Sequence, residues 1–464
     1  MDLGIALRRF GLCGGPQDVP RLQRDPREGV LAEVAAIATA RPQPLPEGLM
    51  TTAAASEIFV NRRAEGRRRR DEINAAVRAR EAPGETGPME APPRGPPMFP
   101  STADIHQSEL QHLLSQAINS MRPLEERLAL FWANHFTVSG ARAQVTFMVG
   151  SFEREAIRPH MLGRFEDLLL ATTLHPAMLR YLDNQASIGP NSPAGRGRRS
   201  VNENLAREVM ELHTLGVDGG YTQADVTAFA GALSGWTAAV WQPDNGPGGT
   251  LFDAERHEPG PKTILGQSFP DGQDQAAAVL RALAAHPSTA RFVTRKLAVH
   301  FLGEAVPPRI PAHLADVWTR SGGDLRAVTE ALIRLPEAWT LPMVRLRSPL
   351  EFVMVAARIM GTSQPPRELL RDLSAMGQPI FRAGSPKGWP EEDNAWTSPD
   401  GIKTRLDWAM NVAAKSASTA DPRRLAEQAF GASLSEPTRL AISRAESSQQ
   451  GLAILLLSPE VQRR

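Results

Sequence analysis

The stretch NENLAREVMELHTLG, residues 202–216, decides the fold class because its apolar residues recur with the period of an α-helix. At 3.6 residues per turn, Leu205, Val209 and Leu212 form one apolar stripe, which another helix must cover. Most of the remaining sequence has the same periodicity, so we expect a mainly α-helical protein. The other side chains form one flank with Asn204, Glu208 and Glu211, a second flank with Asn202, Ala206 and His213, and an outward side with Glu203, Arg207 and Met210.

The first of these flanks favours acid–base or metal chemistry. Glu208 and Glu211 are three residues apart and can reach one site. Two carboxylates that share a site either bind a cation or raise the pKa of one of them, which suits a general acid. Glu211 and His213 lie about 160° apart on a straight helix, so they cannot share an ion. The alternative is structural, because Arg207 can pair with glutamates four positions away on either side and an asparagine can cap the helix.

A second candidate region is LALFWANHFTVS, residues 128–139, where His135 lies on an apolar face at the end of a helix. A hydrogen-bonded core histidine is the simpler interpretation. We expect the helices 123–135 and 201–215 to pack together, because each has an apolar stripe that needs a partner. That packing would bring His135 close to the carboxylates. The catalytic candidates are therefore Glu208, Glu211, His135 and Asn204, with Glu208, Glu211 and His135 as candidate ligands of a divalent metal.

Further out, the sequence predicts an irregular multi-helix bundle with a small β insertion near 237–270. There, WTAAVWQ, GTLFDAE and KTILG are typical of short strands between turns. Residues 82–100 contain seven prolines, which prevent helix formation and indicate a linker. We therefore expect an N-terminal helical segment with an Arg-rich helix (1–81), a Pro/Gly-rich linker (82–104), a helical core (105–361) and a C-terminal irregular segment with helices (362–464).

Composition narrows the class of protein. With 42% apolar and 22% charged residues, the 464-residue chain is not mostly disordered, and its net charge of +1 gives no sign of a nucleic-acid binder. A single cysteine, Cys13, excludes an internal disulfide and a Cys-rich metal site. The 5 Lys against 47 Arg are explained most simply by a GC-rich genome. The motifs GxSxG, Walker A and HExxH are absent, which disfavours the commonest hydrolase and NTPase classes.

The sequence shows no signal peptide and no apolar run of about 18 residues. The cytoplasm is the default location, with export alongside a partner left open. Residues 52–81 predict a long polar helix rich in arginine. A solvated arm is the simpler interpretation, and contact with an anionic partner is the alternative. Nucleic acid is the least favoured partner, because the basic run has few aromatic residues for stacking on bases.

Two further regions contain candidate residues. His257 lies in the turn-rich RHEPGPK and is interpreted first as an exposed loop histidine, with a base or ligand role as the alternative. The irregular stretch 376–400 is long enough to suggest a functional loop. Within it, KGWPEEDNAW places Trp389 and Trp396 beside three acidic residues. We expect the two tryptophan side chains either to form one wall of a substrate site or to anchor the loop by packing into the core.

Several motifs together resemble the bacterial "domain of unknown function 1800" family over nearly the whole chain. The motifs are RRFG (8–11), FWANHFTVS (131–139), MLRYLDN (178–184), NENLARE with ELHTLGVDGGYTQADV (202–226), Gly235-Trp236, His257 with KTILG (262–266), and Gly388-Trp389. The resemblance implies a largely helical bacterial protein without an established activity. It also implies a partner, because members are often encoded beside exported proteins that resemble sulfatases and alkaline phosphatases.

Two hypotheses follow. The first is an acid–base or metal-assisted enzyme, hydrolytic or redox, centred on the Glu/Asn/His face. The second is a non-catalytic maturation or scaffold partner of the co-encoded sulfatase/phosphatase-like protein, in which the same polar residues fix the fold. The chain has only 2 Tyr, and both flank the 202–216 stretch, which points to this region. The candidate binding or network residues are Asn202, Glu203, Arg207, Asp183, Asn184, Tyr181, Tyr221, Trp236, His257 and Trp389.

Overall fold

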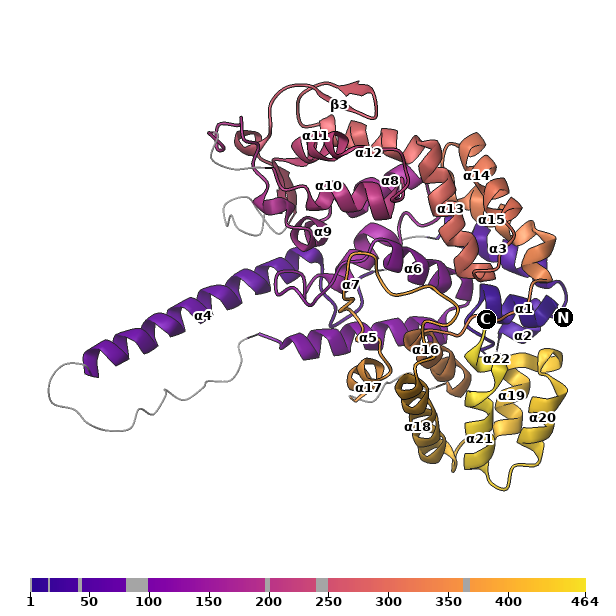
Figure 1. Cartoon of the computed structure of the whole chain (residues 1–464). Helices are drawn as coiled ribbons and strands as arrows, with labels where there is room; N and C mark the ends of the chain where they lie inside the picture. The colour runs from indigo at the N-terminus through magenta and orange to yellow at the C-terminus, as the bar shows by residue number, and fades with distance from the viewer. Residues whose placement is uncertain are drawn as a thin grey trace.

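The computed structural model is mainly helical, as the periodicity predicts (Figure 1). It describes residues 2–15, 17–40, 44–80, 99–196, 201–238, 249–361 and 368–464. Most of the predicted linker at 82–100 therefore lies outside the described residues. The division into four segments stays a prediction.

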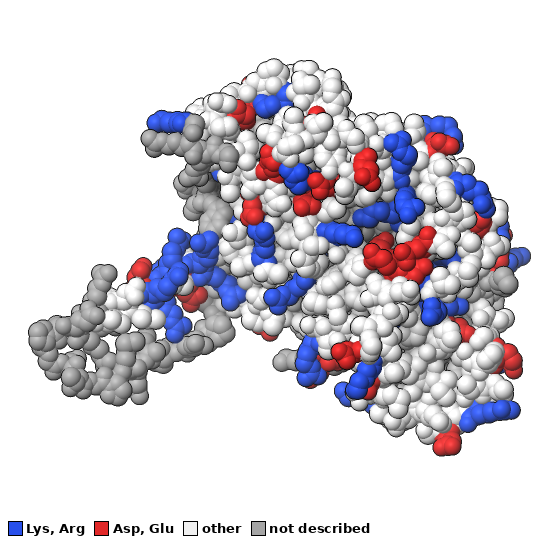
Figure 2. Space-filling view, in the orientation of Figure 1, with Lys and Arg blue, Asp and Glu red and all other residues white. Residues whose placement is uncertain are grey.

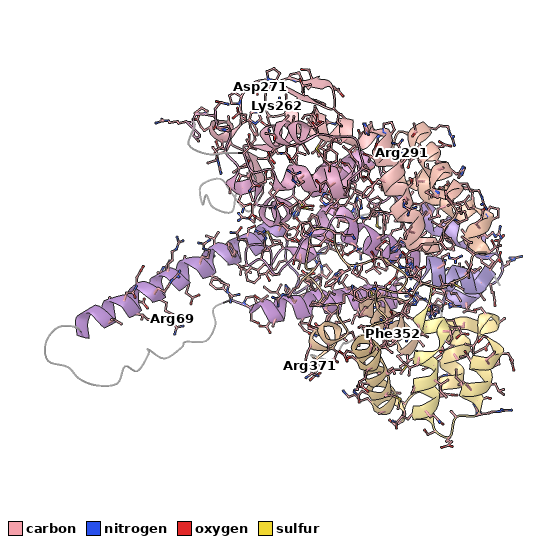
Figure 3. The ribbon with its side chains drawn as sticks, in the orientation of Figure 1. Arg69, Lys262, Asp271, Arg291, Phe352 and Arg371 are labelled. Atoms are coloured by element: carbon pink, nitrogen blue, oxygen red, sulfur yellow. The ribbon has the colours of Figure 1, made fainter. Side chains whose placement is uncertain are left out.

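The N-terminal part contains short helices and one long arm. It consists of α1 (Asp2–Ile5), the π-helical η1 (Ala6–Phe10), α2 (Asp18–Leu22), α3 (Pro26–Ala38) and α4 (Thr52–Arg80). Helix α4 projects from the body, and Figure 2 shows basic side chains gathered along it. Arg69, labelled in Figure 3, is one of four consecutive arginines on the arm that are all exposed. The long polar helix predicted at 52–81 is thus confirmed, and its outer part is a solvated arm.

The central part carries the residues that the motifs single out. It consists of α5 (Thr102–Asn119), α6 (Pro123–His135), α7 (Val149–Phe152), η2 (Glu153–Ile157), α8 (Phe165–Thr173), α9 (Pro176–Tyr181), η3 (Asn184–Ala186), α10 (Asn204–Glu208), η4 (Val209–His213), α11 (Gln223–Leu233), η7 (Ala254–Arg256), α12 (Gln275–Ala285), α13 (Pro287–Leu302), α14 (Arg309–Ser321), α15 (Leu325–Arg334) and η8 (Pro336–Trp339). The turn before α11 uses Gly216 at φ +82 and a capping box between Thr222 and Asp225. This short connection sets α11 against α10.

The predicted β insertion is confirmed as two small antiparallel pairs. Strand β1 (Trp236–Ala238) pairs with β2 (Thr250–Phe252), with Trp236 opposite Phe252. Strand β3 (Lys262–Ile264) pairs with β4 (Gln267–Phe269), with Lys262 opposite Phe269.

The C-terminal part is a second group of helices. It consists of α16 (Pro349–Met360), α17 (Leu369–Ala375), α18 (Pro399–Ser416), α19 (Pro422–Phe430), η9 (Gly431–Ser433), α20 (Glu436–Ser443), α21 (Ser448–Leu457) and α22 (Pro459–Gln462). Its apolar core also includes residues of α5, so the C-terminal helices pack onto the central part. The two ends of the chain lie close together (Figure 1), where Arg8 donates hydrogen bonds to the carbonyls of Pro459 and Arg463.

Residues 376–398 connect α17 to α18 without regular secondary structure and are called the 376–398 loop below. The loop crosses the end of α6 and is fastened at several places. Gly140 donates its N–H to the carbonyl of Phe381 at 2.7 Å, and the Gln378 side chain accepts from the N–H of Leu350 at 2.8 Å. The expectation of an irregular segment here is confirmed. None of the helices within the described ranges is long and apolar enough to cross a membrane.

Candidate functional site

The motif helix is not a straight α-helix. After α10 the chain makes one π-helical turn, η4, which changes the faces that the following residues present. Leu205 and Val209 are fully buried as predicted, but Met210 is fully buried too, so its predicted outward position is wrong. Leu212, expected in the apolar stripe, is half-buried, and His213 is buried. The wider turn therefore moves Met210 and His213 into the core.

Glu208 and Glu211 lie on the outer side of this segment and are half-buried. Partial burial, and then the charge of Glu211, raise the pKa of Glu208 above its ordinary value. Burial and a hydrogen bond with the Glu211 carboxylate raise the pKa of Tyr221 to about 12. The charge of Glu211 thus acts on Glu208, as the spacing predicts.

The neighbouring polar residues form a closed network. Arg207 lies 3.1 Å from Glu203, 3.5 Å from Glu211 and 2.8 Å from the Gln223 side-chain oxygen. Glu203 accepts from Thr227 at 2.7 Å and from Gln223 at 2.8 Å. These contacts tie α10 to α11, which favours a structural role for Glu203 and Arg207.

The candidates before the motif helix also make mainly structural contacts. The Asn202 side-chain oxygen accepts from the N–H of Asn204 at 3.0 Å, at the start of α10. Asn184 donates to the carbonyls of Leu233 and Trp236 at 3.1 and 2.8 Å, which fastens β1 to η3. Asp183 lies 2.7 Å from Arg142, whose guanidinium is 5.9 Å from the centre of the Tyr181 ring. The Trp236 ring packs 5.5 Å from the Phe252 ring.

His257 does not occupy an exposed loop position, so that interpretation is wrong. It is 6% exposed, because the segment folds back against the end of α11. Its Nδ1 lies 2.8 Å from the carbonyl of Ser234 and its Nε2 lies 3.3 Å from Asp271. The carbonyl and the carboxylate hold the ring in place from opposite sides.

His135 is buried and contacts the motif helix at its end. Its Nε2 lies 3.1 Å from the carbonyl of His213, so α6 and η4 meet at their C-terminal ends. Its Nδ1 lies 3.0 Å from Nζ of Lys296 on α13. The expected approach of the two helices is confirmed, but the contacts of His135 are with a carbonyl and an ammonium group.

Within the described ranges, no three or more His, Cys, Asp and Glu side chains gather where they could hold a metal ion. The metal set expected from Glu208, Glu211 and His135 therefore does not form. The physical reason is that His135 faces the inside of the bundle, whereas Glu208 at the end of α10 and Glu211 on η4 lie on the outer side.

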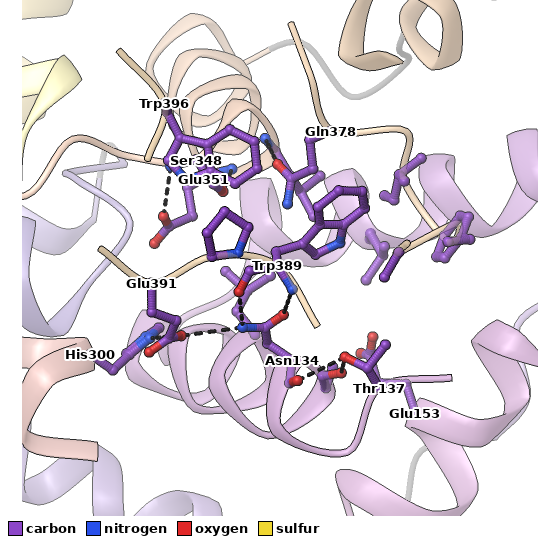
Figure 4. A pocket seen from close by; sticks show the side chains of 18 of the residues that line it. Asn134, Thr137, Glu153, His300, Ser348, Glu351, Gln378, Trp389, Glu391 and Trp396 are labelled. Carbon is purple, nitrogen blue, oxygen red and sulfur yellow. Dashed lines mark hydrogen bonds and ion pairs between the residues drawn. The ribbon is translucent and has the colours of Figure 1, made fainter. Parts of the chain in front are cut away.

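The structure brings together a different group of polar residues, at a cavity of about 150 Å³ between α6 and the 376–398 loop (Figure 4). Asn134 holds the loop there: its side-chain oxygen accepts from the N–H of Trp389 at 2.7 Å, and its amide donates to the Trp389 carbonyl at 3.0 Å. The rings of Trp389 and Trp396 lie 6.2 Å apart, and both line the cavity. The two tryptophans thus form part of the cavity lining, and Trp396 is also buried, so a substrate wall and an anchor both stay predictions.

At one end of the cavity Glu391 meets His300 from α13. The Nδ1 atom of His300 lies 3.1 Å from Oε1 of Glu391, and the Arg345 guanidinium is 3.9 Å from the same carboxylate. Burial acts to raise the pKa of Glu391, but contact with His300 and the charges of Arg345 and Lys296 outweigh it and hold the pKa below its ordinary value. Burial, and then Arg464, lower the pKa of His300 to about 4. The pair is therefore a carboxylate beside a neutral imidazole at neutral pH.

Sequence reasoning missed Lys296 and His300 and gave Glu391 no role of its own. Lys296 and His300 are four residues apart on one helix, a spacing that places them on one face. Another available signal was that Lys296 is one of only 5 Lys beside 47 Arg. Nothing in the local sequence around Glu391 indicates that the loop reaches α13.

Substitution of His213 tests how much a buried imidazole without hydrogen-bond partners costs the stability of this region. It is fully buried, and no described group lies within hydrogen-bond distance of either ring nitrogen. Burial, and then the charge of Lys296, lower its pKa to about 3. We expect His213→Phe to raise the free energy of unfolding by about 1–2 kcal/mol at pH 7, because it removes two unsatisfied polar atoms.

The pH dependence follows from the sign of that shift. The unfolded ring takes up a proton below about pH 6.5 and the folded ring resists it, so His213 costs stability as the pH falls from 6.5 towards 3. The advantage of His213→Phe should therefore grow between pH 7 and pH 5, as measured by urea unfolding. The matched control, His313→Phe on the exposed part of α14, should change stability by less than about 0.5 kcal/mol. A loss of stability in His213→Phe at both pH values would show that the ring has a polar role.

Comparison with known proteins identifies a family. A family model described as "Protein of unknown function (DUF1800)" matches residues 5–463. No curated protein and no solved structure matches the chain.

Proposed function

Since the chain belongs to the DUF1800 family, whose function is unknown, we propose that it is an enzyme that carries out general acid–base catalysis on a small molecule in the cavity beneath the 376–398 loop. The observation that carries the proposal is the His300–Glu391 pair at the cavity wall. A cavity of about 150 Å³ holds a molecule about the size of benzene. Apolar walls with a few converging polar groups are typical of small-molecule sites.

The tautomer of His300 follows from its partner. An ionised carboxylate only accepts hydrogen bonds, so Nδ1 of His300 carries the proton and donates a hydrogen bond to Glu391. The Nε2 atom then has a lone pair; it is buried and has no hydrogen-bond partner among the described residues, so a substrate must displace a neighbouring group to reach it. Glu391 would also stabilise the imidazolium that forms when Nε2 takes a proton, as carboxylates do in other His–carboxylate pairs. His300 is therefore the proposed base and Glu391 its positioning residue.

The proposal predicts a large effect at His300. We expect His300→Asn to lower kcat/KM by about 10²–10⁴-fold, because it removes the proton acceptor and keeps a polar side chain. Turnover would be measured on a panel of esters, lactones and enolisable carbonyl compounds. His313→Asn, an exposed histidine on α14, is the matched control and should leave turnover unchanged.

The pH profile supplies a second readout. His300 works as a base only when neutral, so kcat/KM should be level from about pH 5 to 8 and fall as the pH drops through about 4. Wild-type turnover by His300→Asn on a substrate that binds in the cavity would contradict the proposal. So would a profile without an acid limb.

A second candidate function rests on helix α4. Its projecting outer part carries the exposed residues Arg67, Arg68, Arg69 and Arg70, a surface suited to an acidic partner (Figure 3). The partner proposed from the family resemblance is the co-encoded sulfatase/phosphatase-like protein. Replacing the four arginines with glutamate should abolish co-elution of the two proteins in size-exclusion chromatography. Absence of co-elution with the wild-type chain would contradict this function and leave the catalytic proposal unaffected.

A further inference from the structure

Lys296 stands out because the chain almost always uses arginine where it needs a positive charge. Arginine does not lose its proton in proteins, whereas lysine does when it is buried. Lys296 is half-buried in α13 and makes no ion pair with any carboxylate among the described residues, although Glu391 is near enough to act on its charge. The Phe292 ring, 5.7 Å from Nζ, and the charge of Glu391 therefore compensate the ammonium group without a direct ion pair.

The hydrogen bonds of the two His135 ring nitrogens show that Lys296 is the donor in its contact with His135. The carbonyl of His213 accepts a hydrogen bond, so the Nε2 atom of His135, 3.1 Å away, carries the imidazole proton. The Nδ1 atom of His135 then has a lone pair, and Lys296 must donate to it across 3.0 Å. Burial, and then the charge of Lys296, hold the pKa of His135 well below its ordinary value, so this imidazole stays neutral. A neutral acceptor stabilises the ammonium form less than a carboxylate would.

The charged and titratable groups around Lys296 come from three elements. Glu391 and Lys387 belong to the 376–398 loop, His135 to α6 and His213 to η4. Burial lowers the pKa of Lys296 first, Lys387 lowers it further, and Glu391 acts to raise it. The net result is a pKa below the ordinary value of 10.5.

Two other lysines show what Lys296 lacks. Lys403 lies on the surface, 2.6 Å from Asp407, and this contact raises its pKa. Lys262 donates to three turn carbonyls at 2.6 to 3.1 Å, which hold all three of its protons, although burial lowers its pKa too. Lys296 has one hydrogen-bond acceptor, the neutral His135, and its Nζ lies 5.7 Å from the Phe292 ring, so deprotonation breaks no ion pair.

We propose that Lys296 is a reactive amine that forms an imine with a small aldehyde or ketone. The inference goes beyond the proposed function, because Lys296 is not among the residues that line the cavity and this chemistry does not need His300 as a base. Its second support is the contact geometry, in which the His135 imidazole orients the amine.

The step is balanced without an oxidant or reductant. The Nζ lone pair attacks the carbonyl carbon, a C–N bond forms, and the carbonyl oxygen takes up a proton to give a carbinolamine. The carbinolamine then loses its hydroxyl group and the remaining N–H proton as water, which leaves a C=N bond. Lysine amines activated by desolvation or by a nearby cation react in this way.

The scarcity of lysine makes the test sharp, since only five side chains compete. The full chain would be treated at pH 7 with limiting acetaldehyde and sodium cyanoborohydride, and each lysine would be quantified by peptide mass spectrometry. We expect Lys296 to be alkylated at least tenfold more than Lys403. Trace acetylation across pH 6–11 should give a midpoint for Lys296 at lower pH than that of Lys403.

Lys296→Arg is the matched variant, because it keeps the positive charge and removes the amine. It should lose the modification and keep the thermal unfolding midpoint of the wild type. Alkylation of Lys296 at or below the level of Lys403, or an acetylation midpoint at or above that of Lys403, would overturn the proposal. His300→Asn should leave the labelling of Lys296 unchanged, which separates failure of this inference from failure of the proposed function.

Discussion

Replacing Gly388 with alanine is expected to detach the 376–398 loop from α6 and to abolish binding in the cavity. Gly388 has φ +83, a conformation that costs about 1–3 kcal/mol for residues with a Cβ. A Cβ atom there would lie 2.5 Å from the carbonyl oxygen of Asn134, 2.6 Å from its side-chain oxygen and 2.7 Å from the hydroxyl of Thr137. One of these atoms belongs to the backbone at the end of α6, so the strain is not relieved by turning a side chain.

The consequence for the site is direct, because Gly388 precedes the residue that Asn134 clamps. If the loop moves, Glu391 loses its position beside His300, and a displacement of about 1 Å can cost about 10²-fold in rate. We expect Gly388→Ala to destabilise the protein by about 2–5 kcal/mol and to lower ligand affinity or turnover by at least 100-fold. Urea unfolding, turnover on the substrate panel and the fluorescence of Trp389 and Trp396 would measure these effects.

The same loop contains a matched control. A Cβ atom at Gly384 would point into open space, with no atom within 4 Å, and the φ of Gly384 lies outside the left-handed region. Gly384→Ala should leave stability within about 0.5 kcal/mol and leave binding unchanged. Equal behaviour of the two variants would show that the contact between Gly388 and Asn134 does not hold the loop.

The second large effect is expected at Arg358, a buried residue of α16 that is 3% exposed. Its guanidinium lies 2.5 Å from the carboxylate of Asp18, which is 1% exposed. It also donates to carbonyls at the end of α5, including Ser120 at 2.8 Å. One side chain thus connects the N-terminal segment, α5 and the C-terminal helices.

We expect Arg358→Met to lower the free energy of unfolding by about 3–5 kcal/mol, because it leaves the buried Asp18 carboxylate without its main partner. Chemical denaturation followed by circular dichroism would measure the loss. Arg371→Met on α17 (Arg371 is labelled in Figure 3) is the control, since the Arg371 side chain is 76% exposed and its contact with Asp372 is solvated. The double variant Asp18→Asn with Arg358→Met should lose less than the two single losses together. A loss below about 1 kcal/mol in Arg358→Met would contradict the expected role.

The sequence predicted helices and strands correctly where the spacing of apolar residues and the capping or turn residues at the ends of the segment indicated the same element. The arm at 52–81, the helix ending at His135 and the strands at 236–238 and 262–264 all follow from side-chain spacing and turn residues. The prediction was wrong at Met210, because a π-turn depends on packing and leaves no clear mark in the sequence. It was also wrong for His257, whose burial depends on contacts with Ser234 and Asp271.

For the candidate site, local reasoning found Trp389 and the two clustered glutamates. It did not find the His300–Glu391 pair, whose members are 91 positions apart. It also expected His135 to join Glu208 and Glu211, whereas the bundle directs His135 towards Lys296. A candidate made of residues on one helix can be predicted from spacing, but one made from a helix and a distant loop cannot.

The sequence by itself determined the family, the helical class, the small strands and the concentration of polar residues at 202–226, since each depends on residue types within a few turns of one another. Only the tertiary structure decided which of those residues lie together. The folded chain places neutral His135, half-buried Lys296 and the Glu391–His300 pair around the end of α6. The reason is physical: the pKa of a histidine, lysine or glutamate is set by burial and by charges that other segments bring close, and no local pattern specifies those neighbours.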